Sequence, residues 1–399
     1  MDARDPSQIL VVEPQCSGSA HELPNAGLVS LLRRTYPSAR LILMADVGHI
    51  GRVETILRMA GADSFHDAIP IDVPAQPRTR RSHRLQLHLL DRLSSLGFVA
   101  ESNLTVFAGA LPETLMALGA NGQAWLGGGR VVVVLHGMLE DLLKSEWSLG
   151  IERFRYGVRP RPGRAFYTVQ RGLRATVGLP VSYIVLSPSI LNSPSASVIP
   201  PGHSFGALNM PLVMLGSDYE APAGVLRIGV IGKRDDDFLL SMSQHLQEMS
   251  RHDIEFVVFG ESSRRLASHR AFTFLANGGH VPRETIESEM RNIALMAYSY
   301  PSDGYCLSMS GAFFEAICHG RPAVFTPNRG FRFANQAFGV DLGLEVSDGA
   351  AAARAIASRS WGNESSALAY RKGLESKLRM WNSDNESRLR SIVSDISQG

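Results

Sequence analysis

The stretch from Tyr300 to Pro327 carries the residues with the clearest chemical potential. Its pattern predicts a strand, a loop, a helix that begins near Ser310, and another strand. The unpaired amides and the positive dipole end of such a helix favour an anion such as a diphosphate. Gly311 lets the backbone approach a ligand closely, and Ser308 and Ser310 add hydroxyl donors. Ser310 also suits the helix cap, so simple capping is the alternative to a diphosphate site.

Glu315 is expected about one turn into this helix, within the apolar run AFFEAIC. A carboxylate is costly to bury unless it has a partner. The ribose hydroxyls of a nucleotide beside the diphosphate would supply hydrogen bonds, and an internal partner such as an arginine is the alternative. Gly320 and Pro322 are expected to end the helix and to open the next strand.

The spacing of Glu315, Ala316, Gly320 and Pro322 resembles a signature of the retaining GT-B glycosyltransferases of family 4, which reads carboxylate-alanine-x-x-x-glycine-x-proline. The segments GVIGKRDDD, FVVFGE and NGGHVPRETIESEM resemble other strand-loop units of that family, so the resemblance covers most of residues 225–330. It implies an α/β protein with the GT-B fold, in which two Rossmann-like domains have parallel sheets that face each other across a cleft. It also implies sugar transfer from a nucleotide-diphosphate donor.

The same resemblance implies where a donor would bind. The phosphate contacts would come from the loop of Gly232, Lys233 and Arg234, in which Arg offers paired hydrogen bonds and Lys a point charge. The nucleotide base would meet the backbone near His280 and Val281. The donor would be a UDP- or GDP-linked sugar that acts as a co-substrate, with no separate cofactor.

Leu307 departs from the family pattern, which usually has a first glutamate eight residues before the second one. Asp303 is the nearest upstream acid and a candidate contact to the sugar. The stretch SMSGAFFEA resembles bacterial polysaccharide transferases that carry a serine-glycine pair before the helix. That likeness implies a glycan or lipid-linked oligosaccharide acceptor, surface or extracellular polysaccharide synthesis, and retention of configuration. A catalytically silent GT-B partner protein and a nucleotide-sugar epimerase are the alternatives.

The loop PQCSGSAHELPN, which follows the first strand, resembles the acceptor-side loop of the family. Gly18 would let a phosphate or sugar approach the backbone, and His21 and Asn25 are candidate substrate contacts. His136 directly follows the strand VVVVL, where open α/β sheets place their ligands. His21 and His136 are therefore candidate catalytic residues beside Glu315. A solvated loop histidine for His21 and a core histidine for His136 are the alternatives.

The candidate site residues can come together only if the strands before them end at the same edge of a sheet. Short apolar runs alternate with amphipathic stretches, which is typical of βαβ units. Domains are expected at residues 1–215 and 216–362, followed by a helical segment at 363–399 that packs back across both. Residues 192–224 are rich in Pro, Gly and Ser and predict a linker. The predicted elements are strands at 8–13, 40–45, 104–108, 130–135, 182–186, 226–232, 254–260, 272–279, 293–300 and 322–327, and helices at 26–35 and 82–96.

Composition restricts the class of protein. The chain has 399 residues, 44% of them hydrophobic, and a net charge of +2, which gives no reason to expect a nucleic-acid partner. Its three cysteines include no CxxC pair, and its N-terminus lacks the apolar core of a signal peptide. A cytoplasmic protein is the expectation. The basic stretches 77–84 and 151–174 predict contact with the inner face of a membrane, with solvated loops as the alternative.

Metal binding is not expected. The acidic run from Asp235 to Asp237 is typical of a helix start, where the dipole favours negative charge. His136 and Glu140 have helical spacing but lack a third ligand.

Overall fold

The computed structural model divides the chain into two compact units. Unit 1 comprises residues 1–211, 306–309 and 382–399, and unit 2 comprises residues 212–305 and 310–381. The structure describes residues 5–17, 21–73, 80–96, 101–126, 129–143, 168–216, 219–220, 224–232, 234–260, 263–276, 281–300, 305, 307–338, 342–358 and 364–395.

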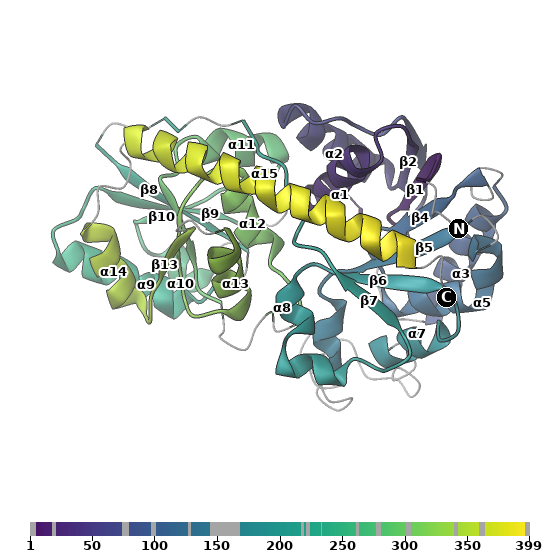
Figure 1. Ribbon diagram of the computed structural model, residues 1–399. Coiled ribbons are helices and arrows are strands. Elements are labelled where there is room, and N and C mark those ends of the chain that lie inside the picture. Colours follow the sequence, from purple (N-terminus) through teal and green to yellow (C-terminus); the bar gives the residue numbers. More distant parts are fainter. Residues whose placement is uncertain are drawn as a thin grey trace. The chain divides into compact units, whose positions relative to one another are not determined.

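Unit 1 contains a sheet of seven parallel strands in the order β3-β2-β1-β4-β5-β6-β7. Figure 1 labels these strands except β3. The strands are β1 (Gln8–Val12), β2 (Arg40–Ala45), β3 (Asp67–Pro70), β4 (Leu104–Phe107), β5 (Arg130–Leu135), β6 (Val181–Val185) and β7 (Ser204–Ala207). All five residues of β1 are buried, as expected for a parallel strand covered on both faces. The strand order changes direction at β1, which lies between β2 and β4.

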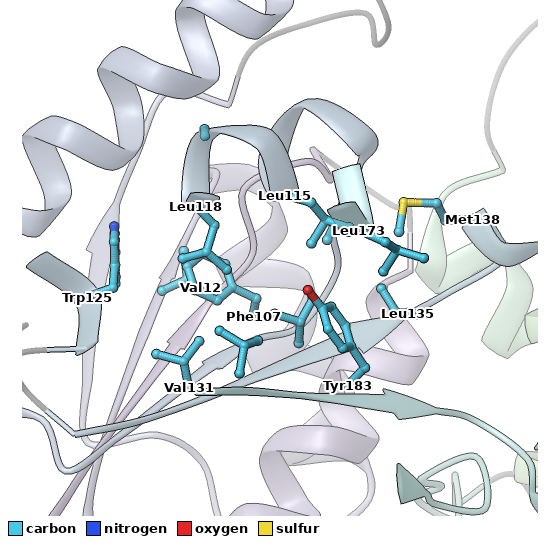
Figure 2. Close-up of a cluster of buried hydrophobic side chains, with 14 of the residues drawn as sticks. Val12, Phe107, Leu115, Leu118, Trp125, Val131, Leu135, Met138, Leu173 and Tyr183 are labelled. Carbon is cyan, nitrogen blue, oxygen red and sulfur yellow. The ribbon is translucent and has the colours of Figure 1, made fainter. Parts of the chain in front are cut away.

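Figure 2 shows the core on one face of this sheet. Strand residues such as Val12, Val131 and Tyr183 belong to one buried cluster with Leu118 and Leu173 from the helices that cover this face. Helix α5 packs against both α3 and α7, and α1 packs against α2. The helical elements are α1 (Glu22–Thr35), α2 (Val47–Met59), α3 (Arg80–Ser94), α5 (Pro112–Leu126), α7 (Val169–Ala175), α8 (Pro188–Leu191) and the 3-10 helices η1 (Met138–Leu143) and η3 (Pro194–Val198).

Unit 2 contains a second parallel sheet, with the strand order β10-β9-β8-β11-β12-β13. The strands are β8 (Leu226–Ile231), β9 (Ile254–Phe259), β10 (Phe272–Phe274), β11 (Leu295–Tyr298), β12 (Ala323–Phe325) and β13 (Gly343–Glu345). The order changes direction at β8, which lies between β9 and β11. Each unit therefore has the Rossmann-like arrangement expected from the sequence.

Helices α9 and α14 pack together, and their apolar faces form the core of unit 2 with strands β8, β9 and β11. The helices of the second half are α9 (Asp236–Glu248), α10 (Arg264–Ala267), α11 (Arg283–Met290), α12 (Gly311–Cys318), α13 (Arg329–Phe338), α14 (Gly349–Ala357) and α15 (Glu364–Asp395). Residues of α15 up to Trp381 belong to unit 2, where Trp381 stacks on Phe338 with ring centroids 4.3 Å apart. The rest of α15 belongs to unit 1, where Arg390 pairs with Asp5 at 3.1 Å.

The structure confirms the predicted α/β class, and each of the ten predicted strand segments overlaps an observed strand. The predicted linker at residues 192–224 is wrong in part, because η3 and strand β7 lie within it. Strands β3 and β13 were also missed. All three missed strands have only three or four residues, and β7 includes Gly206 and a Ser, so they lack an extended apolar run.

Asp235 is the N-cap of α9, where its carboxylate accepts a hydrogen bond from the amide of Asp237 at 2.9 Å. This observation agrees with the interpretation of the acidic run as a helix start. Within the described part of the chain, no helix combines the length and apolar character that a bilayer crossing requires.

Replacement of Leu118 by Ala should lower the free energy of unfolding by about 2–5 kcal/mol, because it leaves a cavity in the core shown in Figure 2. Leu368 is the control, since it is 49% exposed on α15, and its replacement by Ala should cost less than about 0.5 kcal/mol. Urea unfolding followed by circular dichroism measures both. Equal losses in the two variants would contradict this account of the core.

Candidate functional site

The clearest candidate site in unit 2 lies where β8 and β11 end side by side. Open α/β sheets bind ligands outside the carboxyl ends of their strands, at the point where the strand order reverses. Gly232 directly follows β8 and has a φ of 81°, and a Cβ atom placed on it would lie 2.5 Å from the Tyr300 hydroxyl and 2.8 Å from the Cβ of Ala312. The chain therefore passes very close to the start of α12 at this point, and only glycine fits there without strain.

The N-terminus of α12 lies at the same place. Ser310 caps the helix, and its Oγ accepts a hydrogen bond from the amide of Phe313 at 3.3 Å. Its hydroxyl also donates to the hydroxyl of Tyr300 at 3.1 Å. Ser310 is thus committed to internal contacts. Gly311 and Ala312 begin the helix, where backbone amides have no acceptor within the helix itself.

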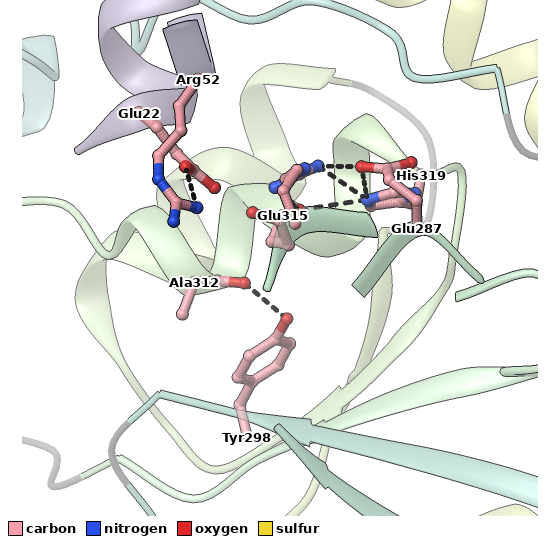
Figure 3. A network of polar contacts seen from close by, with 8 residues as sticks. Glu22, Arg52, Glu287, Tyr298, Ala312, Glu315 and His319 are labelled. Atoms are coloured by element: carbon pink, nitrogen blue, oxygen red, sulfur yellow. Dashed lines mark hydrogen bonds and ion pairs between the residues drawn. The ribbon is translucent and has the colours of Figure 1, made fainter. Parts of the chain in front are cut away.

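Glu315 belongs to a buried group of charged side chains from α11 and the C-terminal end of α12 (Figure 3). Its Oε1 lies 2.7 Å from Nη1 of Arg283 and 3.0 Å from Nε2 of His319. Arg283 also pairs with Glu287, one turn further along α11. Arg283 is 2% exposed and His319 is fully buried. The buried carboxylate thus has an internal arginine partner, which was the alternative to ribose expected from the sequence.

Burial by itself would raise the pKa of Glu315, since it disfavours the charged form. The guanidinium of Arg283 and the hydrogen bond from His319 outweigh that effect and hold the pKa of this carboxyl at about 2. Glu315 is therefore ionised at neutral pH and is fixed in position by its partners.

Glu287, Glu315 and His319 each offer a donor atom, and these atoms lie within 4.8 Å of one another. Two carboxylates and an imidazole could in principle hold a divalent cation. Arg283 pairs with both carboxylates, so its guanidinium already supplies a positive charge to this group. A metal ion would have to displace that guanidinium, which argues against a metal site here.

In unit 1, the corresponding reversal of strand order brings the ends of β1 and β4 together. Glu13 directly follows β1 and is fully buried. One of its oxygens accepts from the amides of Gln15 and Cys16, and the other accepts from Nδ2 of Asn25 at 2.9 Å. Nδ2 of Asn25 also lies 2.9 Å from Nε2 of the buried His49. Among the described residues, no group hydrogen-bonds to the buried Oδ1 of Asn25.

His21 and His136 lie at the same edge of this sheet and stack on each other, with ring centroids 4.6 Å apart. His21 has a φ of 54°, and its Nδ1 lies 3.4 Å from Sγ of Cys16. Loss of hydration, and then the nearby His21, lower the pKa of His136 well below its usual range. This imidazole is therefore neutral near pH 7, and its lowered pKa makes it a weak proton acceptor there.

The structure thus brings His21, Asn25 and His136 to one edge of the unit 1 sheet, and Gly232, Ser310, Gly311 and Glu315 to the reversal point of unit 2 or to its adjoining helix. Arg234 lies beside α9 and pairs with Asp236 at 3.2 Å. Val281 is buried just before α11. Gly18, Lys233, His280 and Asp303 lie outside the described residues.

Ser308 belongs to unit 1, and its hydroxyl donates to Oε1 of Glu140 at 2.9 Å. Leu307, at the position of the family's first glutamate, is fully buried in the core of the same unit. Sequence reasoning assigned no role to Glu13, Arg283 or His49. A carboxylate directly after the first strand was the signal that could have identified Glu13, whereas spacing gave no signal for Arg283.

Comparison with solved structures identifies the architecture. The chain resembles HepE from Anabaena in complex with UDP-glucose, with 12% identity, 98% of each chain covered and a TM-score of 0.51. It also resembles sucrose-phosphate synthase from Thermosynechococcus elongatus, with 12% identity, 98% of each chain covered and a TM-score of 0.52. A glycosyltransferase from Rickettsia africae gives 11% identity and a TM-score of 0.53, over 98% of this chain and 99% of that one.

The chain has a GT-B fold. No protein-family model matches the sequence, and no curated protein matches it either. At 11–12% identity, these likenesses show the fold alone. The activity of a GT-B protein depends on the residues at its site and not on the fold itself.

Replacement of Gly232 by Ala tests the close approach of the β8 loop to α12. Gly61 is a matched control, because its φ is also positive, at 61°, but among the described residues no atom beyond its chain neighbours lies within 4 Å of an added Cβ. Gly61→Ala should cost about 1–2 kcal/mol for the left-handed backbone alone. Gly232→Ala should cost about 1–3 kcal/mol more, because Tyr300 or α12 must shift. Urea unfolding measures both, and equal costs would show that no steric constraint acts at Gly232.

Replacement of Arg283 by Met should destabilise the protein by about 3–5 kcal/mol, because Glu315 and Glu287 lose their buried partner. The control is Arg332→Met, which removes an exposed ion pair with Glu345 and should leave stability nearly unchanged, because solvent screens that pair. Urea unfolding at pH 7 compares the two variants.

The pH dependence of stability gives an independent test of the same ion pair. The pKa of Glu315 is about 2 in the folded protein and near 4.5 ordinarily, so its stabilisation is complete above pH 4.5 and is lost as the pH falls towards 2. Arg283→Met should therefore reduce the loss of stability across this range. A variant that loses stability over the same range as the unmodified protein would show that Arg283 does not hold Glu315 ionised.

Proposed function

We propose that this chain is a glycosyltransferase that moves a sugar from a UDP- or GDP-linked donor to a glycan or lipid-linked oligosaccharide acceptor. The observation that carries the proposal is the approach of Gly232 to the N-terminus of α12, at the point where the strand order of unit 2 reverses. Backbone amides and a helix dipole at such a place suit a diphosphate. The HepE structure is a complex with UDP-glucose, which supports a nucleotide-sugar donor for the same fold.

The chemistry of the proposed donor site follows from charge. When the sugar leaves, negative charge builds up on the diphosphate, and donors that are already in position stabilise that charge best. The amides of Gly311 and Ala312 would act in this way, with Lys233 and Arg234 from the neighbouring loop as cations. Glu315 would accept hydrogen bonds from the ribose. Its ion pair with Arg283 fixes the carboxylate and keeps it charged, as such an acceptor requires.

The acceptor would bind at the carboxyl edge of the unit 1 sheet. His21 and His136 are the proposed contacts to the reacting sugar or hydroxyl, with Asn25 and Gly18 beside them. In a retaining reaction the leaving diphosphate can itself take the acceptor proton, so these imidazoles would position the acceptor rather than act as an obligatory base. Asp303 is the proposed contact to the donor sugar in place of the family's first glutamate.

The pathway and the location in the cell are part of the proposal. Bacterial polysaccharide transferases, which the sequence around Ser310 resembles, suggest a role in surface or extracellular polysaccharide synthesis on the cytoplasmic side of a membrane. The segment from Ile151 to Arg174 contains seven arginines and one glutamate, which would favour attachment to an anionic lipid surface.

Titration with UDP, GDP and their sugar conjugates by calorimetry tests the proposal, followed by measurement of sugar release and transfer. Lys233→Ala should weaken binding of the preferred nucleotide about tenfold, the effect of losing one charge-assisted hydrogen bond. Lys372→Ala is the control, because this lysine lies on α15 and should leave the affinity unchanged. Nucleotide binding without turnover would favour a silent binding protein. If no nucleotide binds, the donor site is wrong.

A further inference from the structure

Unit 1 contains a cavity that the proposed donor and acceptor contacts do not use. Its volume is about 600 Å³, within the range of pockets that hold small molecules. It lies between α3 on one side and the ends of β2 and β3 on the other. Its described lining residues are Asp46, Val47, Ile69, Pro70, Ile71, Asp72, Val73, Leu85, His88, Leu89, Arg92, Leu93 and Leu96.

The lining is mainly aliphatic. Ile69, Leu89 and Leu96 pack against the hydrophobic core of unit 1, so that core forms the floor of the cavity. Val47 is 71% exposed and Leu85 is 41% exposed, although both are apolar. A cavity that continues from the core to exposed aliphatic side chains offers a ligand apolar surface to bury.

The same lining argues against a sugar or a nucleotide base as the occupant. Among its described residues there is no phenyl, phenol or indole ring on which a base could stack, and no amide or hydroxyl side chain. Two carboxylates line it, of which Asp46 caps α2 and Asp72 is exposed to solvent. Binding sites for polar ligands place several aromatic, amide or hydroxyl groups within reach. An aliphatic chain is the ligand that matches this surface.

Two side chains at the cavity indicate which polar group an aliphatic ligand could carry at its end. His88 and Arg92 are four residues apart on α3, so they lie on the same face of that helix. Within the described chain, no carboxylate forms an ion pair with Arg92. The carboxylate of Asp46 is engaged as the N-cap of α2, where it accepts from the amide of Gly48 at 3.0 Å. An exposed guanidinium beside an aliphatic cavity suits a phosphate group at the end of the chain.

We propose that this cavity binds the lipid part of a glycolipid acceptor, an aliphatic chain that ends in a phosphate near Arg92. That the lipid belongs to the acceptor rests on the proposed glycosyltransferase function. Binding of the lipid to the cavity does not depend on that function and can be measured without any sugar donor. Such a site would hold the acceptor on unit 1, the unit that carries His21 and His136.

Calorimetric titration of the full chain with farnesyl phosphate, below the concentration at which it forms micelles, tests the site. We expect saturable binding with one site per chain. Farnesol should bind more weakly because it lacks the charge, and inorganic phosphate alone should show no saturable binding. Leu85→Glu should weaken farnesyl phosphate binding at least about tenfold, because a carboxylate would be buried beside the chain. Arg92→Ala should weaken it about fivefold and leave farnesol binding unchanged.

Val177→Glu is the matched control, because Val177 is 54% exposed and does not line the cavity. It should bind farnesyl phosphate as the unmodified protein does. Val47→Glu provides a second cavity variant, and circular dichroism checks that each variant folds. Absence of saturable binding, or equal affinities for Leu85→Glu, Val47→Glu and Val177→Glu, would overturn the proposal.

A parallel titration with UDP and GDP separates the two proposals. The cavity variants should bind nucleotide normally, because the donor site is proposed in unit 2. Loss of lipid binding with intact nucleotide binding would affect only the cavity proposal. Lipid binding in a chain that binds no nucleotide would leave the cavity in place and contradict the transferase.

Discussion

Every strand in both sheets runs parallel to its neighbours, and this constraint determines where chemistry can occur in the molecule. Parallel strands end at one edge of their sheet, so the loops that follow them gather there. In each unit the strand order reverses next to the first strand, which leaves room between the loops on either side. Glu13 follows β1 and Gly232 follows β8, so each stands at the reversal point of its own sheet. This arrangement explains why the polar residues around Glu13 in unit 1, and the start of α12 in unit 2, lie at the carboxyl edge of their sheets.

The buried charges of unit 2 show a second constraint. A carboxylate inside an apolar helix is tolerated only with a partner, and Glu315 has Arg283 and His319. An apolar replacement of Arg283, Glu287, Glu315 and His319 together could be as stable, because ion pairs lose hydration on burial. The stability of the folded protein is therefore a weak explanation for a carboxylate at position 315. Under the proposed function, the ribose of the donor would be a further contact of this ionised carboxylate.

The sequence predicted the fold class because parallel strands covered on both faces form continuous apolar runs, such as VVVVL before His136. It predicted the start of α12 because Ser310 and Gly311 give a strong local signal for a helix N-terminus. It failed for β3, β7 and β13, which are short and depend on neighbouring strands for their pairing. The partnership of Arg283 with Glu315 was not predictable from spacing, since it joins two helices that are distant in sequence.

Leu307 gives the departure from the family pattern a physical meaning. The side chain is fully buried in the core of unit 1, and its amide donates to the carboxylate of Glu140. A glutamate at this position would place a second carboxylate in an apolar environment beside Glu140, where both burial and like charge oppose it. An apolar side chain therefore suits this position, where Leu307 packs in the hydrophobic core of unit 1. If sugar transfer takes place, another group must make the contact that the first glutamate makes in the resembled family.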